Sequence, residues 1–205
     1  MIPTILSTAY FAPISYFAAI AKAEEVVIEA HEHYQKKSYR SRCYIAGPHG
    51  KQMLNVPIER PSGNQTLITD AKLLFIENWQ KQHWNSIITA YNSSPFFLYY
   101  KDEIEVVFFK KHDTLWELNK ELLILFLELL QIETPVSYTK HYSRDAKDSR
   151  DFRVSIAPKS PLSTKAYIQV FGDKYPYICD LSILDLLFNL GPESLTYLDG
   201  LLIDN

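Results

Sequence analysis

Ionisable side chains recur at every second position just after an apolar segment. Glu29, His31 and His33 would point to the same side of an extended strand. Two imidazoles and a carboxylate on one face can ligate a metal ion or move a proton. Three interpretations stay open: a metal site, a proton-transfer or substrate-binding role for at least one of these residues, and a solvated polar face.

We expect no tightly bound metal at this face. Same-face neighbours on a strand lie about 6.6–6.8 Å apart, whereas zinc bonds are about 2.0–2.2 Å long. Three side chains of one short strand would therefore need a bulge to reach one ion. Neither a pair of nearby cysteines nor a second histidine cluster offers another ligand.

The only strong basic cluster follows directly, and two tyrosines are interleaved with it: Tyr34, Lys36, Lys37, Tyr39, Arg40 and Arg42. Arg40 and Arg42 would share a strand face, a geometry that can hold a phosphate or carboxylate. The alternative is a solvated basic loop paired with Glu32. We favour anion binding because the loop after the first strand of an open α/β sheet usually borders the ligand site. The sequence thus predicts that both arginines share a cleft with Tyr10 and the loop at Pro13.

His83 is a further candidate base. It lies at helical spacing from Trp79 and Ile87, which is typical of a buried and satisfied histidine, and a catalytic role is the alternative. Its apolar neighbours predict that His83 is more buried than His49, in a Gly/Pro loop, or His112, in a Lys-rich loop.

Standard nucleophile and nucleotide motifs are absent. Ser7 ends the first predicted strand without a Gly-x-Ser-x-Gly elbow, and the chain has neither a Gly-x-Gly-x-x-Gly motif nor a P-loop. Cys43 has basic neighbours that could lower its pKa, but a small core residue is the simpler interpretation. Cys43 and Cys179 are too few for a disulfide framework, so we expect reduced thiols. The sequence indicates no particular cofactor.

The elements that must position these residues alternate between strands and helices. Apolar runs and turn residues predict strands at 2–8, 26–28, 43–45, 53–58, 66–76 and 167–171, with the third and fourth forming a hairpin. Helical spacing and capping residues predict helices at 14–23, 78–92 (capped by Asn78), 115–131 (Thr114 and Glu117 as a capping box) and 182–190 (started by Ser182 and Asp185). The first strand, helix and next strand form a βαβ unit. Residues 143–165 are predicted to be a mobile loop.

Length and composition fit one α/β domain over residues 1–205, with a mixed sheet flanked by helices. Apolar residues make up 47% of the 205 and charged residues 22%, which is ordinary for a globular protein. The net charge of −3 gives no basic footprint for nucleic acid. The most apolar segment, 122–127, is far too short to cross a membrane. The N-terminus lacks the basic segment of a signal peptide, so we expect a cytoplasmic protein.

Four blocks of the chain together resemble the WbqC-like family, and the similarity spans nearly the whole chain. They are the lead Ser7–Phe17, the block from Glu29 to Arg42, the pattern from Trp79 to Tyr100, and the closing Leu181–Gly191. Many members open with His-Gln-Pro-x-Tyr-Leu-Pro. Here Ser7-Thr8-Ala9 stand in place of His-Gln-Pro, whereas Tyr10 and Pro13 match. If the family histidine is catalytic, His31 or His83 would have to replace it.

The resemblance implies a role in surface-polysaccharide synthesis, the attachment of an acyl or aminoacyl group to an amino sugar. Arg40, Arg42 and Lys36 would hold an anionic ligand such as a nucleotide sugar or activated acyl donor. His31 or His83, with Glu29, would deprotonate the amine. Three tyrosines would wall the pocket: Tyr10, Tyr34 and Tyr39. The alternative is a non-catalytic ligand-binding or scaffolding protein that kept an anion pocket and lost the catalytic group.

Overall fold

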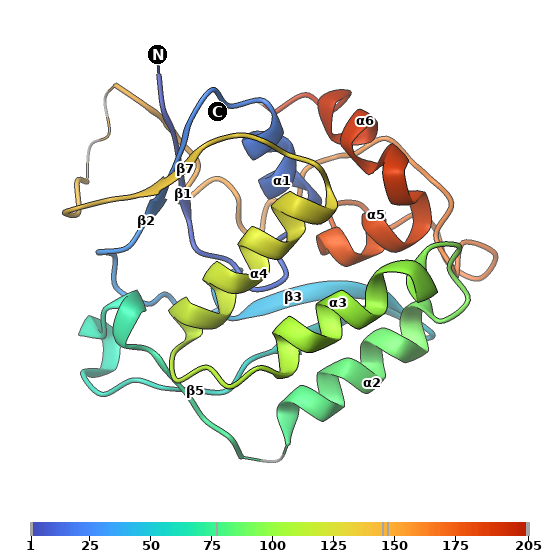
Figure 1. Ribbon diagram of the computed structural model, residues 1–205, viewed down its shortest axis with the longest axis horizontal. Coiled ribbons are helices and arrows are strands. Elements are labelled where there is room, and N and C mark those ends of the chain that lie inside the picture. Colours follow the sequence, from blue (N-terminus) through green and yellow to red (C-terminus); the bar gives the residue numbers. More distant parts are fainter. Residues whose placement is uncertain (1, 77, 145, 147, 204–205) are drawn as a thin grey trace.

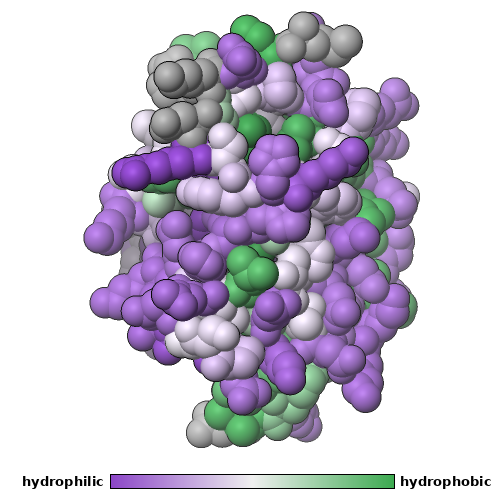
Figure 2. Space-filling model, turned by 90° about the vertical axis from the view of Figure 1, so that its left-hand side faces the viewer, coloured by the Kyte–Doolittle hydropathy of each residue, from purple (hydrophilic) through white to green (hydrophobic). Residues whose placement is uncertain are grey.

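Four parallel strands form the largest sheet among the described residues, on the left-hand side of the molecule in Figure 1, the side that faces the viewer in Figure 2. The computed structural model describes residues 2–76, 78–144, 146 and 148–203. The strand order is β7-β2-β1-β8, with bounds β1 Thr4–Ser7, β2 Val26–Glu29, β7 Val136–Tyr138 and β8 Arg150–Asp151. All four carboxyl ends therefore lie at one edge of the sheet.

The predicted βαβ unit is confirmed. Helix α1 (Ile14–Ala21) connects β1 to the parallel β2, and the register sets Thr4 opposite Val26 and Ser7 opposite Glu29. The alternate side chains Leu6 and Ile28 are buried, as apolar residues in a strand covered on both faces should be. The Ser7–Glu29 pairing brings the polar ends of the two strands together.

Antiparallel pairing is confined to two separate ribbons. The predicted hairpin is confirmed as β3 (Arg42–Gly47) and β4 (Gly50–Asn55), and its turn requires Gly50 at φ 95°. Strands β5 (Ile58–Glu59) and β6 (Lys72–Leu73) form the second ribbon. The long strand predicted at 66–76 is wrong, because residues 68–70 form a 3-10 turn with Ile68 buried.

Three helices cover the middle of the chain: α2 Trp79–Tyr91, α3 Phe97–Phe109 and α4 Leu115–Leu129. The capping box of α4 is confirmed, since Thr114 Oγ1 accepts from the Glu117 amide and Glu117 Oε2 from the Thr114 amide. Asn78 precedes α2 in a left-handed conformation and its side chain does not cap the helix. Helix α3 was not predicted because exposed apolar residues such as Leu98 and Val106 obscure the spacing of its buried face.

The C-terminal part is helical and irregular. Helix α5 (Ile183–Leu190) begins as expected at Ser182, whose hydroxyl accepts from the Leu184 amide. Asp185 does not join that cap; it is buried and accepts hydrogen bonds from Gln169 Nε2 at 2.9 Å and from Tyr167 Oη at 2.5 Å. A 3-10 turn, Gly191–Glu193, leads to the unpredicted helix α6, Ser194–Asp199. Residues 167–171, predicted to be a strand, have no strand pairing.

The segment 143–165 differs from the predicted loop. It contains β8, which pairs with β1, and the two residues after it, Phe152 and Arg153, are buried. Of the predicted loop, residues 145 and 147 lie outside the described part of the chain. A short strand of two charged residues gives no apolar signal, so its place in the sheet depends on the neighbouring β1.

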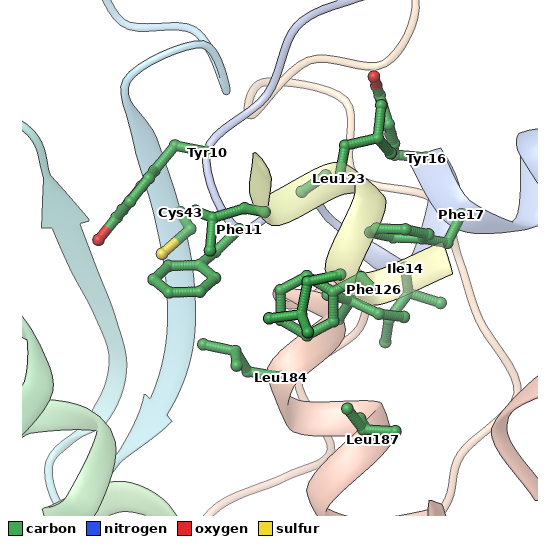
Figure 3. Close-up of a cluster of buried hydrophobic side chains, with 14 of the residues drawn as sticks. Tyr10, Phe11, Ile14, Tyr16, Phe17, Cys43, Leu123, Phe126, Leu184 and Leu187 are labelled. Atoms are coloured by element: carbon green, nitrogen blue, oxygen red, sulfur yellow. The ribbon is translucent and has the colours of Figure 1, made fainter. Parts of the chain in front are cut away.

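One apolar core joins the sheet to the helices (Figure 3). Phe11 and Phe17 pack with Phe126 of α4 at ring-centroid distances of 6.0 and 5.9 Å. Leu184 and Leu187 of α5 complete the same cluster. Among the described residues, no helix combines the length and apolar character that a bilayer crossing requires.

Candidate functional site

Polar residues converge at the carboxyl edge of the parallel sheet. Ser7 ends β1, Glu29 ends β2, Thr139 follows β7 and Asp151 ends β8. Together with three residues that bond to them they form what we call the carboxyl-edge cluster: Ser7, Glu29, Glu32, Arg40, Thr139, Asp151 and Arg153. Ligands of open α/β sheets bind outside this edge, so the cluster is the candidate site.

One half of the cluster joins the end of β1 to the basic block. Arg40 Nε donates to Glu32 Oε1 at 2.8 Å, and a second guanidinium nitrogen contacts the other oxygen of Glu32. That nitrogen also donates to Ser7 Oγ at 2.7 Å, and Ser7 Oγ donates to Glu32 Oε2 at 3.1 Å. All three side chains are buried. The positive charge of Arg40 is therefore already neutralised by a bidentate carboxylate partner.

The other half joins β2 to β8. Arg153 Nη1 donates to Glu29 Oε2 at 2.8 Å, while Nε and Nη2 donate to the carboxylate of Asp151 at 2.9 and 2.6 Å. The hydrogen bonds that Arg153 donates to Asp151 raise the pKa of Arg153, whereas burial acts to lower it. Partial burial by itself raises the pKa of the Asp151 carboxyl, but the Arg153 hydrogen bonds and charge outweigh it and hold that pKa below its usual range.

Glu29 is fully satisfied by its surroundings. Its Oε1 accepts from Thr139 Oγ1 at 2.7 Å and from the His31 amide at 2.9 Å, in addition to the Arg153 contact on Oε2. Thr139 Oγ1 also accepts from the Ala30 amide at 3.0 Å. A buried carboxylate needs such partners to remain charged. The two strand ends are consequently locked to one another.

The cluster carries a surplus of negative charge. It contains three carboxylates, Glu29, Glu32 and Asp151, against the two guanidinium groups of Arg40 and Arg153. Asp151 is the most accessible of the carboxylates, with 29% of its side chain exposed. A site of this charge attracts a cationic group such as an ammonium more readily than a phosphate.

A narrow crevice opens beside the cluster, between the loops that follow β1 and β8. Its lining includes Ser7, Thr8, Arg40, Phe152 and Arg153. The crevice measures about 10 Å³, which is room for about one water molecule. A ligand as large as a sugar would therefore lie against its rim rather than inside it.

The predicted basic pocket is not assembled as expected. Arg40 precedes β3 and is buried against Glu32, whereas Arg42 begins β3 and is half-buried, so the two do not share a strand face. Lys36 is exposed. The alternative pairing of Arg40 with Glu32 is the one observed, although buried rather than solvated.

The three predicted pocket tyrosines have separate surroundings. Tyr39 is buried and lines the crevice, and Tyr34 is half-buried with its hydroxyl 2.7 Å from Ser41 Oγ. Tyr10 is fully buried, and its hydroxyl points away from that of Tyr16 in Figure 3. The hydroxyl of Tyr16 donates to the Ser7 carbonyl at the sheet edge. The prediction that Tyr10 walls a cleft with Arg40 is therefore wrong, because its ring belongs to the core.

Tyr10 instead contacts His83. Its hydroxyl lies 2.9 Å from His83 Nδ1, both rings pack near Trp79, and the Tyr10 ring also packs near Phe108. Burial lowers the pKa of His83 to about 4, against the opposing effect of a hydrogen bond with the Asn55 backbone. His83 is thus a neutral histidine of α2 whose ring is buried against Tyr10 and Trp79.

The exposure of the histidines matches the prediction only in part. His83 is 7% exposed and His49 is exposed, but His112 is only 3% exposed and lies 3.3 Å from Glu121. His112 is buried because the chain between α3 and α4 packs against β6, where Leu73 donates to the Asp113 carbonyl. The lysines around His112 did not indicate this packing.

Glu29, His31 and His33 do not share a strand face. Strand β2 ends at Glu29, which points into the cluster, while His31 and His33 are exposed on the following turn. Within the described residues, no three or more His, Cys, Asp or Glu side chains are arranged to hold a metal ion. His31 is still beside the cluster, since its amide binds Glu29.

Sequence reasoning did not identify Thr139, Asp151 or Arg153 as site residues. The segment Arg150-Asp151-Phe152-Arg153 does not alternate apolar and polar residues, so it gave no local signal of a strand that ends at the site. Cys43, in contrast, is the core residue that was expected, and burial raises the pKa of its thiol.

A larger groove of about 550 Å³ lies between α2 and α3. Apolar side chains such as Trp84, Ile88 and Phe97 line it, with Lys81 and Lys101 among its polar residues. None of the carboxyl-edge residues borders it, so it is separate from the candidate site.

The model of the WbqC-like protein family matches residues 8–170. The chain belongs to the WbqC-like family. The matched span contains every member of the carboxyl-edge cluster except Ser7, which directly precedes it. The closing segment 181–191, which also carried the resemblance, lies beyond the span.

One relative of similar sequence is "Uncharacterized protein Rv1507c" of Mycobacterium tuberculosis (strain ATCC 25618 / H37Rv). It is 25% identical over 225 residues, covering 95% of this chain and 96% of the relative. No solved structure matches this chain. The WbqC-like chain thus has a relative of comparable extent, and its site must be interpreted from its own geometry.

Proposed function

We propose that this WbqC-like protein is a cytoplasmic enzyme of surface-polysaccharide synthesis that transfers an acyl or aminoacyl group from an activated donor to the amine of an amino sugar. The observation that carries the proposal is the negative surplus at the carboxyl edge, three carboxylates against two guanidinium groups. An amino sugar arrives as an ammonium ion, and this charge distribution favours it.

The proposed base is His31. It is exposed at the rim of the cluster, and its amide is fixed by the Glu29 carboxylate at 2.9 Å. His83 is the weaker candidate because it is buried in the core and its low pKa reflects that burial. Glu29 acts in the proposal by holding the turn that carries His31.

The proposed reaction is a nucleophilic acyl substitution. His31 takes a proton from the sugar ammonium, and the freed amine attacks the carbonyl carbon of the donor. A C–N bond forms, and the bond from the carbonyl carbon to the leaving sulfur or oxygen breaks. The second proton lost by nitrogen goes to the departing group or to solvent. General base assistance of this kind contributes about 10²–10⁴ in rate.

Binding of the anionic donor is assigned to the remaining basic groups. Arg40 is committed to Glu32, which leaves the exposed Lys36 and Lys37 and the half-buried Arg42 as candidate cations in this block. The Tyr34 hydroxyl lies 2.7 Å from Oγ of Ser41, the residue before Arg42, and Tyr34 would border the donor.

A second function, ligand binding without catalysis, is favoured by one observation. Ser7-Thr8-Ala9 stand at the rim of the crevice, and Ser7 is held by Arg40 and Glu32 rather than presented as a free catalytic group. Such a chain would keep the amine-binding edge and have no transfer activity.

The experiment incubates the purified protein with a CoA thioester or an aminoacyl donor and a nucleotide-linked amino sugar, and mass spectrometry detects the N-acylated product. We expect product with the wild type and a loss of at least about 10² in rate for His31→Asn. His33→Asn is the matched control, because His33 is also exposed, lies two residues on and is outside the cluster.

Two results would contradict the enzyme. Equal rates in His31→Asn and His33→Asn would remove the proposed base. Wild-type protein that binds the amino sugar in a titration, yet forms no product with any donor, would establish the binding function instead.

A further inference from the structure

An exposed aromatic ring stands over the guanidinium of Arg153. Tyr142 lies in the connection between β7 and β8 and is 53% exposed, and the Arg153 guanidinium carbon is 5.2 Å from its ring centroid. Arg153 itself is held by Glu29 and Asp151 and is almost entirely covered. The ring therefore rests on a fixed cation at the edge of the candidate site.

The connection that carries Tyr142 is anchored close to the ring. The Thr139 amide donates to the Ile28 carbonyl at 3.1 Å, and its hydroxyl donates to Glu29. Tyr142 follows three residues later. With one ring face against Arg153 and more than half of the residue exposed, the other face is presented to solvent.

Such a ring has the chemistry of a carbohydrate platform. One face of a pyranose is lined by C–H groups and packs on an aromatic ring, while its hydroxyl and amino groups project sideways to polar partners. The accessible carboxylate of Asp151 provides such a partner, because it shares Arg153 with the ring.

We propose that Tyr142 is the sugar-binding platform of this protein and that Arg153 is the positioning residue that orients it. The inference rests on the proposed function, since it assigns where the amino sugar lies. The sugar ring stacks on the free face of Tyr142, whose other face contacts Arg153, a residue that also lines the crevice too small to hold a sugar. The ammonium group is then directed toward the carboxylates of the cluster.

The test is saturation-transfer NMR and titration with D-glucosamine as the probe. We expect binding by the wild type, roughly tenfold weaker binding by Tyr142→Ala, and a change of less than about threefold for Tyr142→Phe, which keeps the ring. Tyr99→Ala is the matched control, because Tyr99 is an even more exposed tyrosine on α3, outside the cluster, and we expect no change.

A second variant tests the role of Arg153. Arg153→Lys keeps the charge but loses the planar fork that binds Asp151 and Glu29 and supports the ring. We expect weaker glucosamine binding and a shift of the Tyr142 ring resonances. Circular dichroism and urea unfolding of every variant establish that the fold is retained.

The outcomes separate this inference from the proposed function. Unchanged glucosamine binding in Tyr142→Ala, or no binding by the wild type, overturns the platform, whatever the transfer assay gives. Binding that depends on Tyr142 in a protein that forms no acylated product supports the platform and overturns the enzyme.

Discussion

The Arg153 guanidinium meets the Glu29 carboxylate at 2.8 Å, joining two residues 124 positions apart in the sequence. Glu29 ends β2 and Arg153 follows β8, and these two strands lie on opposite sides of β1. The contact therefore spans the end of the central strand and fixes both sides of the candidate site.

Removal of Arg153 should strongly destabilise the fold. Arg153→Ala leaves the buried Glu29 and the half-buried Asp151 without their cation, and we expect a loss of about 3–5 kcal/mol in the free energy of unfolding, measured by urea denaturation. Arg144→Ala, at an exposed arginine between β7 and β8, should change the free energy of unfolding by less than about 0.5 kcal/mol. Equal effects would show that the ion pair does not form.

Arg40 should behave as a structural partner of Glu32 rather than as a free anion ligand. Arg40→Ala uncovers a buried carboxylate and should cost about 3 kcal/mol in the free energy of unfolding. Lys36→Ala, in the exposed part of the same block, should leave stability within about 0.5 kcal/mol. A stable Arg40→Ala protein with weaker binding of inorganic phosphate would restore the predicted anion pocket.

Stability should fall in mild acid because of His83. Burial lowers its pKa to about 4 in the folded state, below the 6.5 of the unfolded chain, so the unfolded state takes up the proton first. Above pH 6.5 the neutral, buried His83 contributes on the order of 3 kcal/mol to the free energy of unfolding. This contribution is lost as the pH falls toward 4.

The measurement for His83 compares urea unfolding at pH 7.5 and pH 4.5 in the wild type and in His83→Gln. The variant lacks the titrating group, so its free energy of unfolding should fall less between the two pH values. Other acidic groups affect both proteins alike. The same pH dependence in both would mean that His83 is not buried as described.

Gly191 should not tolerate a side chain. It ends α5 at φ 53°, and a Cβ there would lie 2.5 Å from Phe96 Cδ1. We expect Gly191→Ala to cost about 2–3 kcal/mol, from the left-handed backbone and the overlap together. Gly63→Ala is the control: its φ is 59° with no neighbouring atom within 4 Å, so thermal and urea unfolding should show only about 1 kcal/mol. Equal losses in the two variants would show that the overlap with Phe96 does not add to the cost of Gly191→Ala.

Local patterns were sufficient where the signal lies within a few residues. The βαβ start, the β3–β4 hairpin and the Thr114–Glu117 capping box were all predictable, because strand alternation, turn residues and helix caps depend on near neighbours. The sequence also predicted a site in the 29–42 block, and Glu29, Glu32 and Arg40 of that block lie in the carboxyl-edge cluster.

Only the tertiary structure decided which of these groups meet. Arg40 contacts Glu32 and Ser7 because the strand spacing ends at Glu29. Tyr10, in the loop after β1, packs in the core beside His83. Asp151 and Arg153 reach the site through β8, a two-residue strand that alone is too short and polar to be predicted. Its position depends on pairing with β1 and on burying Phe152. Contacts across more than a hundred residues are set by sheet order and core packing, and no local pattern encodes them.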